Sequence, residues 1–257
     1  MASNRASPRS RWLPVAVLLA AVMLWCTLSA LGLFHPSTFP SPWRVALGFG
    51  EEVRSGRLLD DTIVSLFRVG AGFGAAVLLG VPMGLALAHH VRLRSAFSPA
   101  IHFFRSLSPL AWIPFAILWF GIGDAPAIFL IFLASLFPLV MAAMVAVDGI
   151  PSVYFRVAYE HGITGWELIH RVTFPAILPQ VITALRVTAG VAWLVVVAAE
   201  MVAGRAGLGF AIMDARNGLR TDLVVVGMIV IGVIGVIIDR LLTGLTRIPS
   251  VRWGYER

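Results

Sequence analysis

Long stretches without a charged side chain alternate with short polar segments along this chain. Four of them, residues 12–43, 69–91, 106–123 and 125–147, contain no Asp, Glu, Lys or Arg. Two more are less uniform, because residues 181–203 include Arg186 and Glu200, and residues 223–238 end before Asp239. A helix needs about 20 apolar residues to cross a bilayer. The pattern therefore predicts six transmembrane helices, at residues 13–34, 62–88, 100–121, 126–147, 181–203 and 222–245.

The composition agrees with a membrane protein and excludes several classes of function. Of the 257 residues, 59% are hydrophobic and only 13% are charged, which is about half the charged share of a soluble domain. All 20 basic residues are arginine. The absence of lysine excludes a Walker A nucleotide-binding loop and Schiff-base catalysis, and the single cysteine, Cys26, excludes a disulfide framework.

Motifs of catalysis and metal binding are also missing from the sequence. It contains no His-Glu-x-x-His, no Cys-x-x-Cys and no Gly-x-Ser-x-Gly. We therefore expect a chain that is not an enzyme and has no catalytic residues, no metal site and no cofactor of its own. The arginines are scattered singly between apolar stretches rather than clustered, so we expect no nucleic-acid partner.

The distribution of arginine predicts the orientation in the membrane. With both termini in the cytoplasm, the cytoplasmic segments hold eleven arginines and the outer segments six, and three within spans complete the 20. This excess follows the positive-inside rule. We expect residues 1–61 to form the first span and an extracytoplasmic segment, residues 62–246 a core of five spans, and residues 247–257 a cytoplasmic tail. In the outer segment, Ser41 followed by Pro42 predicts the start of a short interfacial helix.

The longest predicted cytoplasmic loop, residues 148–180, reads as a helix–turn–helix. A first helix is predicted from about Ser152 to Gly162, a residue type that tolerates the left-handed conformation after a helix. Thr164-Gly165-Trp166-Glu167 fits a capping box, which predicts that a second helix opens there. Pro175 is expected to end that second helix.

Charged and bulky side chains within the predicted spans are candidates for a translocation path or gate. An arginine or carboxylate within a bilayer usually faces protein or a water-filled path. Arg68 is either a positive site for an anion or half of a structural pair, whereas Arg186 and Glu200 either reach the membrane surfaces or join helices. Proline kinks interrupt the span at 100–121, where an aromatic side chain either packs or gates. The candidates are Arg68, Arg105, Trp112, Pro114, Arg186, Trp193 and Glu200.

The loop resembles that of the permease subunits of bacterial ABC importers. In that family the loop reads Glu-Ala-Ala, three residues, Gly, nine residues, then Ile-x-Leu-Pro. Aligned on Gly162, Ala158 and Pro175 match, and Arg156 replaces the glutamate. Segments over residues 40–245 are similar to the nitrate/sulfonate/taurine branch. They are Pro40–Val45, Ser108–Pro114, Trp119–Gly123, Leu185–Arg186, Gly190–Trp193, Ala198–Met201, Gly207–Gly209 and Asp214–Arg216.

This resemblance implies an all-α membrane protein of the type I ABC importer permease class, in the plasma (inner) membrane. The loop would be a coupling helix that docks into an ATPase, with Arg156, Ala158, Tyr159, Glu160, His161, Gly162, Thr164, Gly165 and Trp166 as its contact residues. The implied partners are a second copy of the chain or a paralogous permease, two cytoplasmic ATPase subunits that bind ATP and magnesium, and an extracytoplasmic binding protein. The implied cargo is a small anion such as nitrate, bicarbonate, a sulfonate, taurine or an aromatic acid. The alternatives are a neutral heterocycle such as a thiamine pyrimidine precursor, or an ion-coupled secondary transporter.

Overall fold

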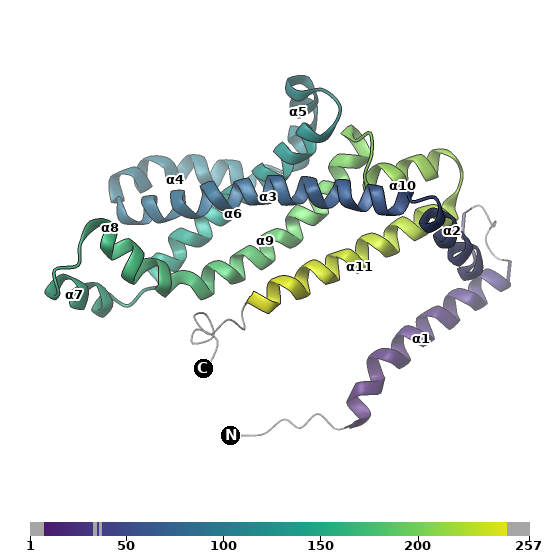
Figure 1. Ribbon diagram of the computed structural model, residues 1–257, viewed down its shortest axis with the longest axis horizontal. Coiled ribbons are helices and arrows are strands. Elements are labelled where there is room, and N and C mark those ends of the chain that lie inside the picture. The colour runs from purple at the N-terminus through teal and green to yellow at the C-terminus, as the bar shows by residue number, and fades with distance from the viewer. Residues whose placement is uncertain (1–7, 33–34, 36–37, 246–257) are drawn as a thin grey trace. The chain divides into compact units, whose positions relative to one another are not determined.

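The computed structural model describes residues 8–32, 35 and 38–245, and every regular element in these residues is a helix (Figure 1). The α-helices are α1 (Pro8–Ala30), α2 (Pro42–Arg54), α3 (Arg57–His89), α4 (Val91–Ser106), α5 (Ile113–Phe120), α6 (Asp124–Asp148), α7 (Ser152–Glu160), α8 (Gly165–Leu168), α9 (Phe174–Ala203), α10 (Leu208–Asn217) and α11 (Thr221–Leu245). A 3₁₀ turn, η1 (Pro109–Trp112), and a π turn, η2 (Ile169–Thr173), complete them. The all-α fold is confirmed. The tail predicted at 247–257 lies outside the described residues.

The chain divides into two compact units, which are described separately. One contains the residues up to Leu59 together with Ala211–Val230, and the other contains Asp60–Phe210 together with the chain from Ile231 onward. Within the first unit, Arg220 bonds Glu51 at 2.8 Å and Arg57 bonds Asp214 at 2.5 Å. The second unit holds α4 to α9 and most of α3, and it contains the predicted loop and all seven candidate path residues.

The core of the second unit depends on a row of small residues along α3. Gly72, Ala76, Gly80 and Gly84 follow one another at intervals of four and are all buried. A Cβ built on Gly72 would lie 2.7 Å from the carbonyl oxygen of Ile128, and one built on Gly84 would lie 2.6 Å from that of Val140. Such rows allow the backbones of membrane helices to approach closely, since lipid offers no hydrophobic drive for their association. The row therefore lets α3 pack against α6.

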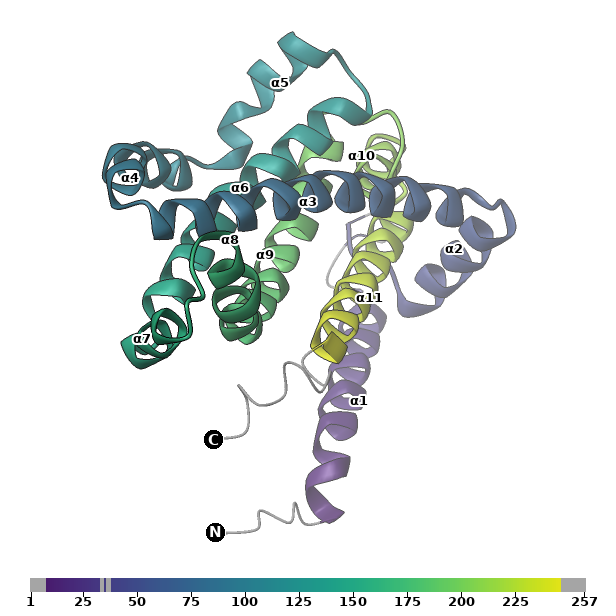
Figure 2. The ribbon, with the colours of Figure 1, turned by 60° about the vertical axis from the view of Figure 1, so that its left-hand side comes forward.

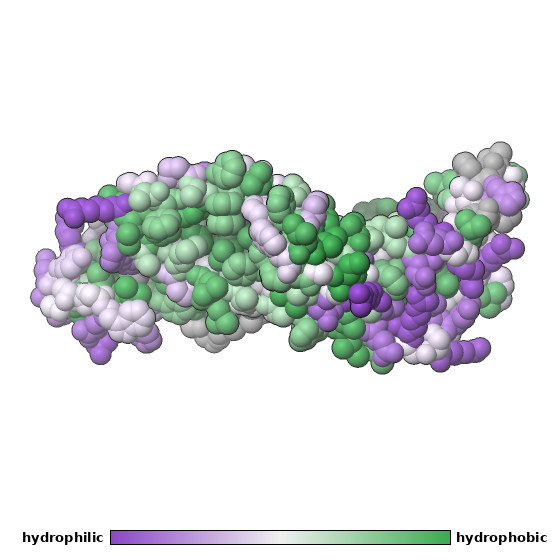
Figure 3. All heavy atoms as spheres, turned by 90° about the horizontal axis from the view of Figure 1, so that it is seen from above, coloured by the Kyte–Doolittle hydropathy of each residue, from purple (hydrophilic) through white to green (hydrophobic). Residues whose placement is uncertain are grey.

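Aliphatic side chains from three helices fill the space around this contact. Val81 and Leu85 of α3, Ala146 and Val147 of α6, and Ile177 and Val181 of α9 form one buried cluster. Over the helices of this unit, Figure 3 shows a broad hydrophobic surface, with hydrophilic residues gathered at the end that carries α7 and α8. This distribution is typical of a multi-pass membrane protein, whose middle faces lipid and whose ends face water.

The predicted spans are found as helices, with two corrections. By length and composition, four helices qualify as spans: α3, α6, the continuous segment Gly165–Ala203 and Thr221–Gly244. The span predicted at 13–34 is helical in α1, but its apolar helix, Val15–Ala30, is shorter than the spans that qualify. The single helix predicted at 100–121 is wrong, because α4 and the η1–α5 segment meet at an angle of 88°. Counting that bent pair as one span gives up to five instead of six.

The break between α4 and α5 has a local cause. Ser108 has extended backbone angles and is followed by Pro109, and a residue before proline is disfavoured in the helical conformation. Pro109 and Pro114 both sit in first helical turns, where the missing N–H leaves no hydrogen bond unmade. The prolines therefore start new helices after the break, instead of kinking a single span.

The expectation that Pro175 ends a helix is also wrong. The chain is helical from Gly165 to Ala203. The π turn η2 directly precedes α9, whose second residue is Pro175. A proline ring clashes with the carbonyl four residues earlier in a regular α-helix, and the wider π turn relieves this clash. Thr164 occupies the predicted N-cap position of α8, but its side chain makes no capping hydrogen bond. Glu167 instead pairs with Arg171 at 3.1 Å.

Other local predictions are confirmed. Ser41 accepts a hydrogen bond from the backbone N–H of Arg44 at 3.4 Å and so caps α2, with Pro42 at the first helical position. The helix predicted from Ser152 is α7. The helix α10, which follows Gly207, was not expected from the sequence.

The α3–α6 contact yields the first prediction. We expect Gly84→Leu to destabilise the protein by about 1–3 kcal/mol, the usual range for overpacking a close contact. Thermal unfolding of the purified protein in detergent would measure the loss. Gly74→Leu is the matched control, because a Cβ on Gly74 meets nothing within 4 Å. Equal melting temperatures for the two variants would contradict the close contact.

Candidate functional site: a buried ion-pair network and an exposed loop

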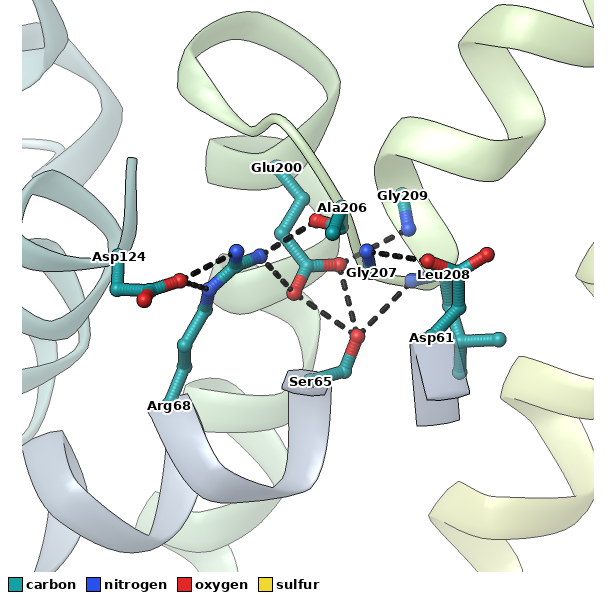
Figure 4. Close-up of polar contacts among 9 residues, drawn as sticks. All are labelled: Asp61, Ser65, Arg68, Asp124, Glu200, Ala206, Gly207, Leu208 and Gly209. Atoms are coloured by element: carbon teal, nitrogen blue, oxygen red, sulfur yellow. Dashed lines mark hydrogen bonds and ion pairs between the residues drawn. The ribbon is translucent and has the colours of Figure 1, made fainter. Parts of the chain in front are cut away.

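A buried arginine on α3 lies at the centre of the most elaborate polar network in the described residues (Figure 4). Arg68 donates from Nη1 to Oε1 of Glu200 at 2.7 Å, and from Nε and Nη2 to Oδ1 of Asp124 at 2.8 and 2.6 Å. Nη1 also donates to the backbone carbonyl oxygen of Ala206 at 2.7 Å. Every nitrogen of the guanidinium is therefore engaged, and α3, α6 and α9 meet at one side chain.

The carboxylate of Glu200 is enclosed by donors. Its oxygens accept from the Ser65 hydroxyl at 2.8 and 2.9 Å, from Arg68, and from the backbone N–H of Gly209 at 2.9 Å. The side chains of Arg68 and Glu200 are only 2% and 0% exposed. Removing one partner of such a pair leaves an uncompensated buried charge, which is strongly destabilising.

The same network also forms hydrogen bonds with the start of α10. The backbone N–H groups of three successive residues point at side chains from α3 and α9, as Figure 4 shows. Gly207 donates to Asp61 at 2.7 Å, Leu208 to the Ser65 hydroxyl at 2.9 Å, and Gly209 to Glu200. These are N–H groups that no helical carbonyl can satisfy at a helix start. Side chains therefore fix the turn between α9 and α10.

The other candidate path residues lie apart from this network. Arg186 forms a two-point ion pair with Asp239, at 2.6 and 2.9 Å, and joins α9 to the end of α11. Trp193 is buried, and its indole N–H donates to the carbonyl oxygen of Ile231 at 3.0 Å. Arg105 is exposed in the last turn of α4. Trp112 packs against Phe104, Phe115, Trp119 and Phe129, while Pro114 is exposed at the start of α5.

The network bears on the alternatives that the sequence left open for Arg68 and Glu200. Arg68 has carboxylate partners, and Glu200 is buried between helices instead of reaching a membrane surface. Other members of the network were not among the predicted path residues: Asp61, Ser65, Asp124 and the turn Gly207–Gly209. One signal was available: Asp124 is the only charged residue between two long apolar stretches, 106–123 and 125–147.

The loop at the other end of α3 places most of its predicted residues on the surface. Helix α7 ends in a Schellman motif, in which Ile163 donates to the carbonyl of Ala158 at 2.9 Å and Gly162 to that of Tyr159 at 3.0 Å. Gly162 has φ +72°, a left-handed conformation that favours glycine. Of the nine predicted contact residues, Ala158 is buried and the others are exposed. They are Arg156, Tyr159, Glu160, His161, Gly162, Thr164, Gly165 and Trp166.

A groove of about 1020 Å³ lies between α7 and the start of α9. Its walls include Tyr154, Val157 and His161 from the α7 side, and Arg171 and Pro175 from the other. The network around Arg68 lies 21 residues before the end of α3 at His89, or about 31 Å along the helix. The two features therefore lie about one hydrocarbon thickness apart.

The first unit holds a separate charged pocket of about 600 Å³, lined by Arg44, Glu51, Arg220 and Asp222 among others. Hydrogen bonds from Arg220 lower the pKa of Glu51 below its usual value. The bond to Asp222, followed by that to Glu51, raises the pKa of Arg220. Both groups therefore stay charged throughout the physiological pH range.

Comparisons with known proteins define the class of this protein. Residues 76–248 match the family described as binding-protein-dependent transport system inner membrane component, and the chain belongs to that family. An ABC transporter permease protein of Methanocaldococcus jannaschii is 35% identical over 239 residues, covering 89% of this chain and 87% of the relative. The taurine transport system permease protein of Escherichia coli is 34% identical over 247 residues, covering 93% and 90%.

The solved structures agree on the fold. The permease of the methionine ABC transporter in an inward-facing conformation superimposes with a TM-score of 0.61 at 20% identity, covering 76% of this chain and 99% of that one.

Relatives also include permeases named for aliphatic sulfonates, nitrate and bicarbonate. The chain is thus an ABC importer permease of the nitrate, sulfonate, taurine and bicarbonate branch, a membrane transport component of a kind that has no ATPase site of its own.

The buried pair yields the second prediction. We expect Glu200→Gln to lower the free energy of unfolding by about 3 kcal/mol, because Arg68 loses its buried counter-charge. Thermal unfolding in nanodiscs would measure the loss. Asp239→Asn is the control, since it breaks the half-exposed pair with Arg186 and should cost less than about 1 kcal/mol. A Glu200 variant as stable as the control would show that the network contributes little.

Proposed function

We propose that this chain forms the translocation path of an ATP-driven importer for a small anion. A binding protein outside the membrane would deliver the anion, and two cytoplasmic ATPase subunits would supply the energy. The permease would work as two copies of this chain or as a pair with a paralogue, with its termini in the cytoplasm of a cell bounded by a plasma (inner) membrane. The chain itself would need no metal and no cofactor, because ATP and magnesium would bind the partner ATPase.

The observation that carries this proposal is the loop built around α7. The short helix α7, which ends just before Gly162, presents Arg156 and Tyr159 to solvent, and α8 presents Trp166. The helix α8 continues through η2 into α9 without a break, from Gly165 to Ala203, and the short turn at residues 161–164 joins α7 to this segment. A displacement of α8 by a partner would therefore pass directly into a span. This is the geometry that rigid-body switching between two states requires.

The cargo assignment is supported by the relatives, whose names specify taurine, sulfonates, nitrate and bicarbonate. Four residues of the second unit remain candidates for the path or gate. Trp193 is buried in α9, and the other three lie near the break between α4 and α5: Arg105, Trp112 and Pro114. Arg68, Arg186 and Glu200 are proposed to hold the helices that line the path.

A tagged pull-down from native membranes tests the assembly. We expect two copies of a nucleotide-binding subunit to accompany two permease chains, and the purified complex to hydrolyse ATP. The cognate binding protein would then be screened against nitrate, bicarbonate, sulfonates, taurine and aromatic acids. A neutral heterocycle as the only ligand would overturn the anion assignment. Recovery of the chain without an ATPase, together with uptake driven by an ion gradient, would overturn the importer itself.

The loop yields the third prediction. We expect Gly162→Val to reduce transport at least tenfold while the protein still inserts, because a β-branched residue in the left-handed conformation is strained by about 1–2 kcal/mol and would displace the end of α7. Uptake into proteoliposomes and ATP hydrolysis, measured together, would show hydrolysis uncoupled from transport. Gly162→Asn is the control, since asparagine tolerates this conformation. Normal uptake by the valine variant would contradict the coupling role.

A further inference from the structure

The ion-pair network around Arg68 has two unequal halves. The half formed with Glu200 is buried on both sides, and the glutamate is also held by Ser65 and by a backbone N–H. In the half formed with Asp124, the aspartate side chain is 59% exposed and uses one oxygen, Oδ1, for both bonds from Arg68. Water can therefore compete for Asp124 but not for Glu200, and the Asp124 half is the weaker one.

Asp124 also stands directly after a turn that contains two glycines. It is the first residue of α6 and follows a turn in which Gly121 and Gly123 have φ +76° and +151°. Before that turn lies α5, which Figures 1 and 2 both show projecting away from the layer of α3, α6 and α9. The exposed side chains of Leu118, Trp119 and Phe120 agree with this placement.

Few other bonds hold the start of α6 to its neighbours. The backbone N–H of Gly123 donates to the carbonyl oxygen of Ala203 at 3.2 Å, and Asp124 adds the ion pair with Arg68. The other end of α5 is the 88° break after α4. The segment from η1 to Asp124 is therefore bounded by two breaks. Aromatic side chains of this segment pack against Phe129 of α6, and the exposed Asp124 adds an ion pair at its far end.

We propose that Asp124 is a positioning residue of the transport cycle. Its bond to Arg68 holds the α5–α6 turn in the state seen here, and this bond breaks when the translocation path opens at this end of the helices. Arg68 then stays in place, because its Nη1 still donates hydrogen bonds to Glu200 and to the carbonyl oxygen of Ala206. The buried half is a fixed anchor, and the exposed half is the part that opens. This inference rests on the proposed ATP-driven import.

The test uses the complete importer with its ATPases, reconstituted in nanodiscs. In Asp124→Asn we expect ATP hydrolysis without binding protein to rise about two- to fivefold, the factor that corresponds to the loss of one partly exposed ion pair. Stimulation by the binding protein should fall by the same factor, since the bond it would break is already absent. Asp124→Glu, which keeps the charge, should restore most of the difference.

The matched control is another aspartate that pairs with an arginine, within the first unit. Asp214 of α10 pairs with Arg57 at 2.5 Å, and both side chains are about half exposed. Asp214→Asn removes the same charge and a comparable ion pair, and should leave the basal rate and the stimulation unchanged. An equal rise in both asparagine variants would overturn the proposal, because the effect would then belong to the loss of any exposed ion pair rather than to the bond with Arg68.

A second measurement does not depend on the ATPase. Hydrogen exchange of the backbone amides at residues 121–127 should be faster in Asp124→Asn permease than in the wild type, and unchanged in Asp214→Asn. Unchanged exchange and an unchanged basal rate in Asp124→Asn would overturn the role of Asp124. Loss of the assembled importer in both Asp124 variants would also overturn it, since Asp124 would then be needed for folding alone. Failure of the wild-type chain to assemble with an ATPase would count against the proposed function, while the exchange data would still decide the role of this bond.

Discussion

The structure depends on the requirement that a charge inside a membrane protein must be neutralised and fully hydrogen-bonded. Arg68 meets it by drawing Glu200, Asp124 and the carbonyl of Ala206 to one point, from segments 56 to 138 residues away in sequence. Because Arg68 and Glu200 are both buried, water cannot replace Glu200 as a partner without a large loss of stability. One guanidinium therefore defines how the ends of α3, α6 and α9 meet.

The second constraint acts on the backbone. Lipid offers no hydrogen bonds, so helices in a membrane pack through shape, and the small residues of α3 allow the backbone of α6 to approach within contact distance. Two departures from a regular α-helix occur next to proline. At Pro109 the departure is a sharp break, whereas at Pro175 a π turn preserves the helix. The first sets the η1–α5 segment at 88° to α4, and the second joins α8 to α9 as one continuous helical segment.

These features give the second unit a fixed part and a movable part. The fixed part is the layer of α3, α6 and α9, held by close packing and by the buried half of the ion-pair network. The movable part is the segment around α5, which is bounded by breaks and fastened by a half-exposed ion pair. The loop around α7 and this segment lie at opposite ends of the long helices α6 and α9.

The sequence by itself determined the class of the protein, the positions of most helices and the helix that ends at Gly162. Each of these follows from a pattern of neighbouring residues: a run of apolar residues about as long as the bilayer is thick, a serine before a proline, or a glycine after a helix. Only the tertiary structure decided that Arg68 pairs with Glu200 and Asp124, that residues 91–120 form a bent pair, and that the helix continues through Pro175. Hydropathy could not reveal these, because it records how much a segment prefers lipid to water. The partners of a buried charge, and the relief of a proline clash, are set by residues that approach only when the helices pack.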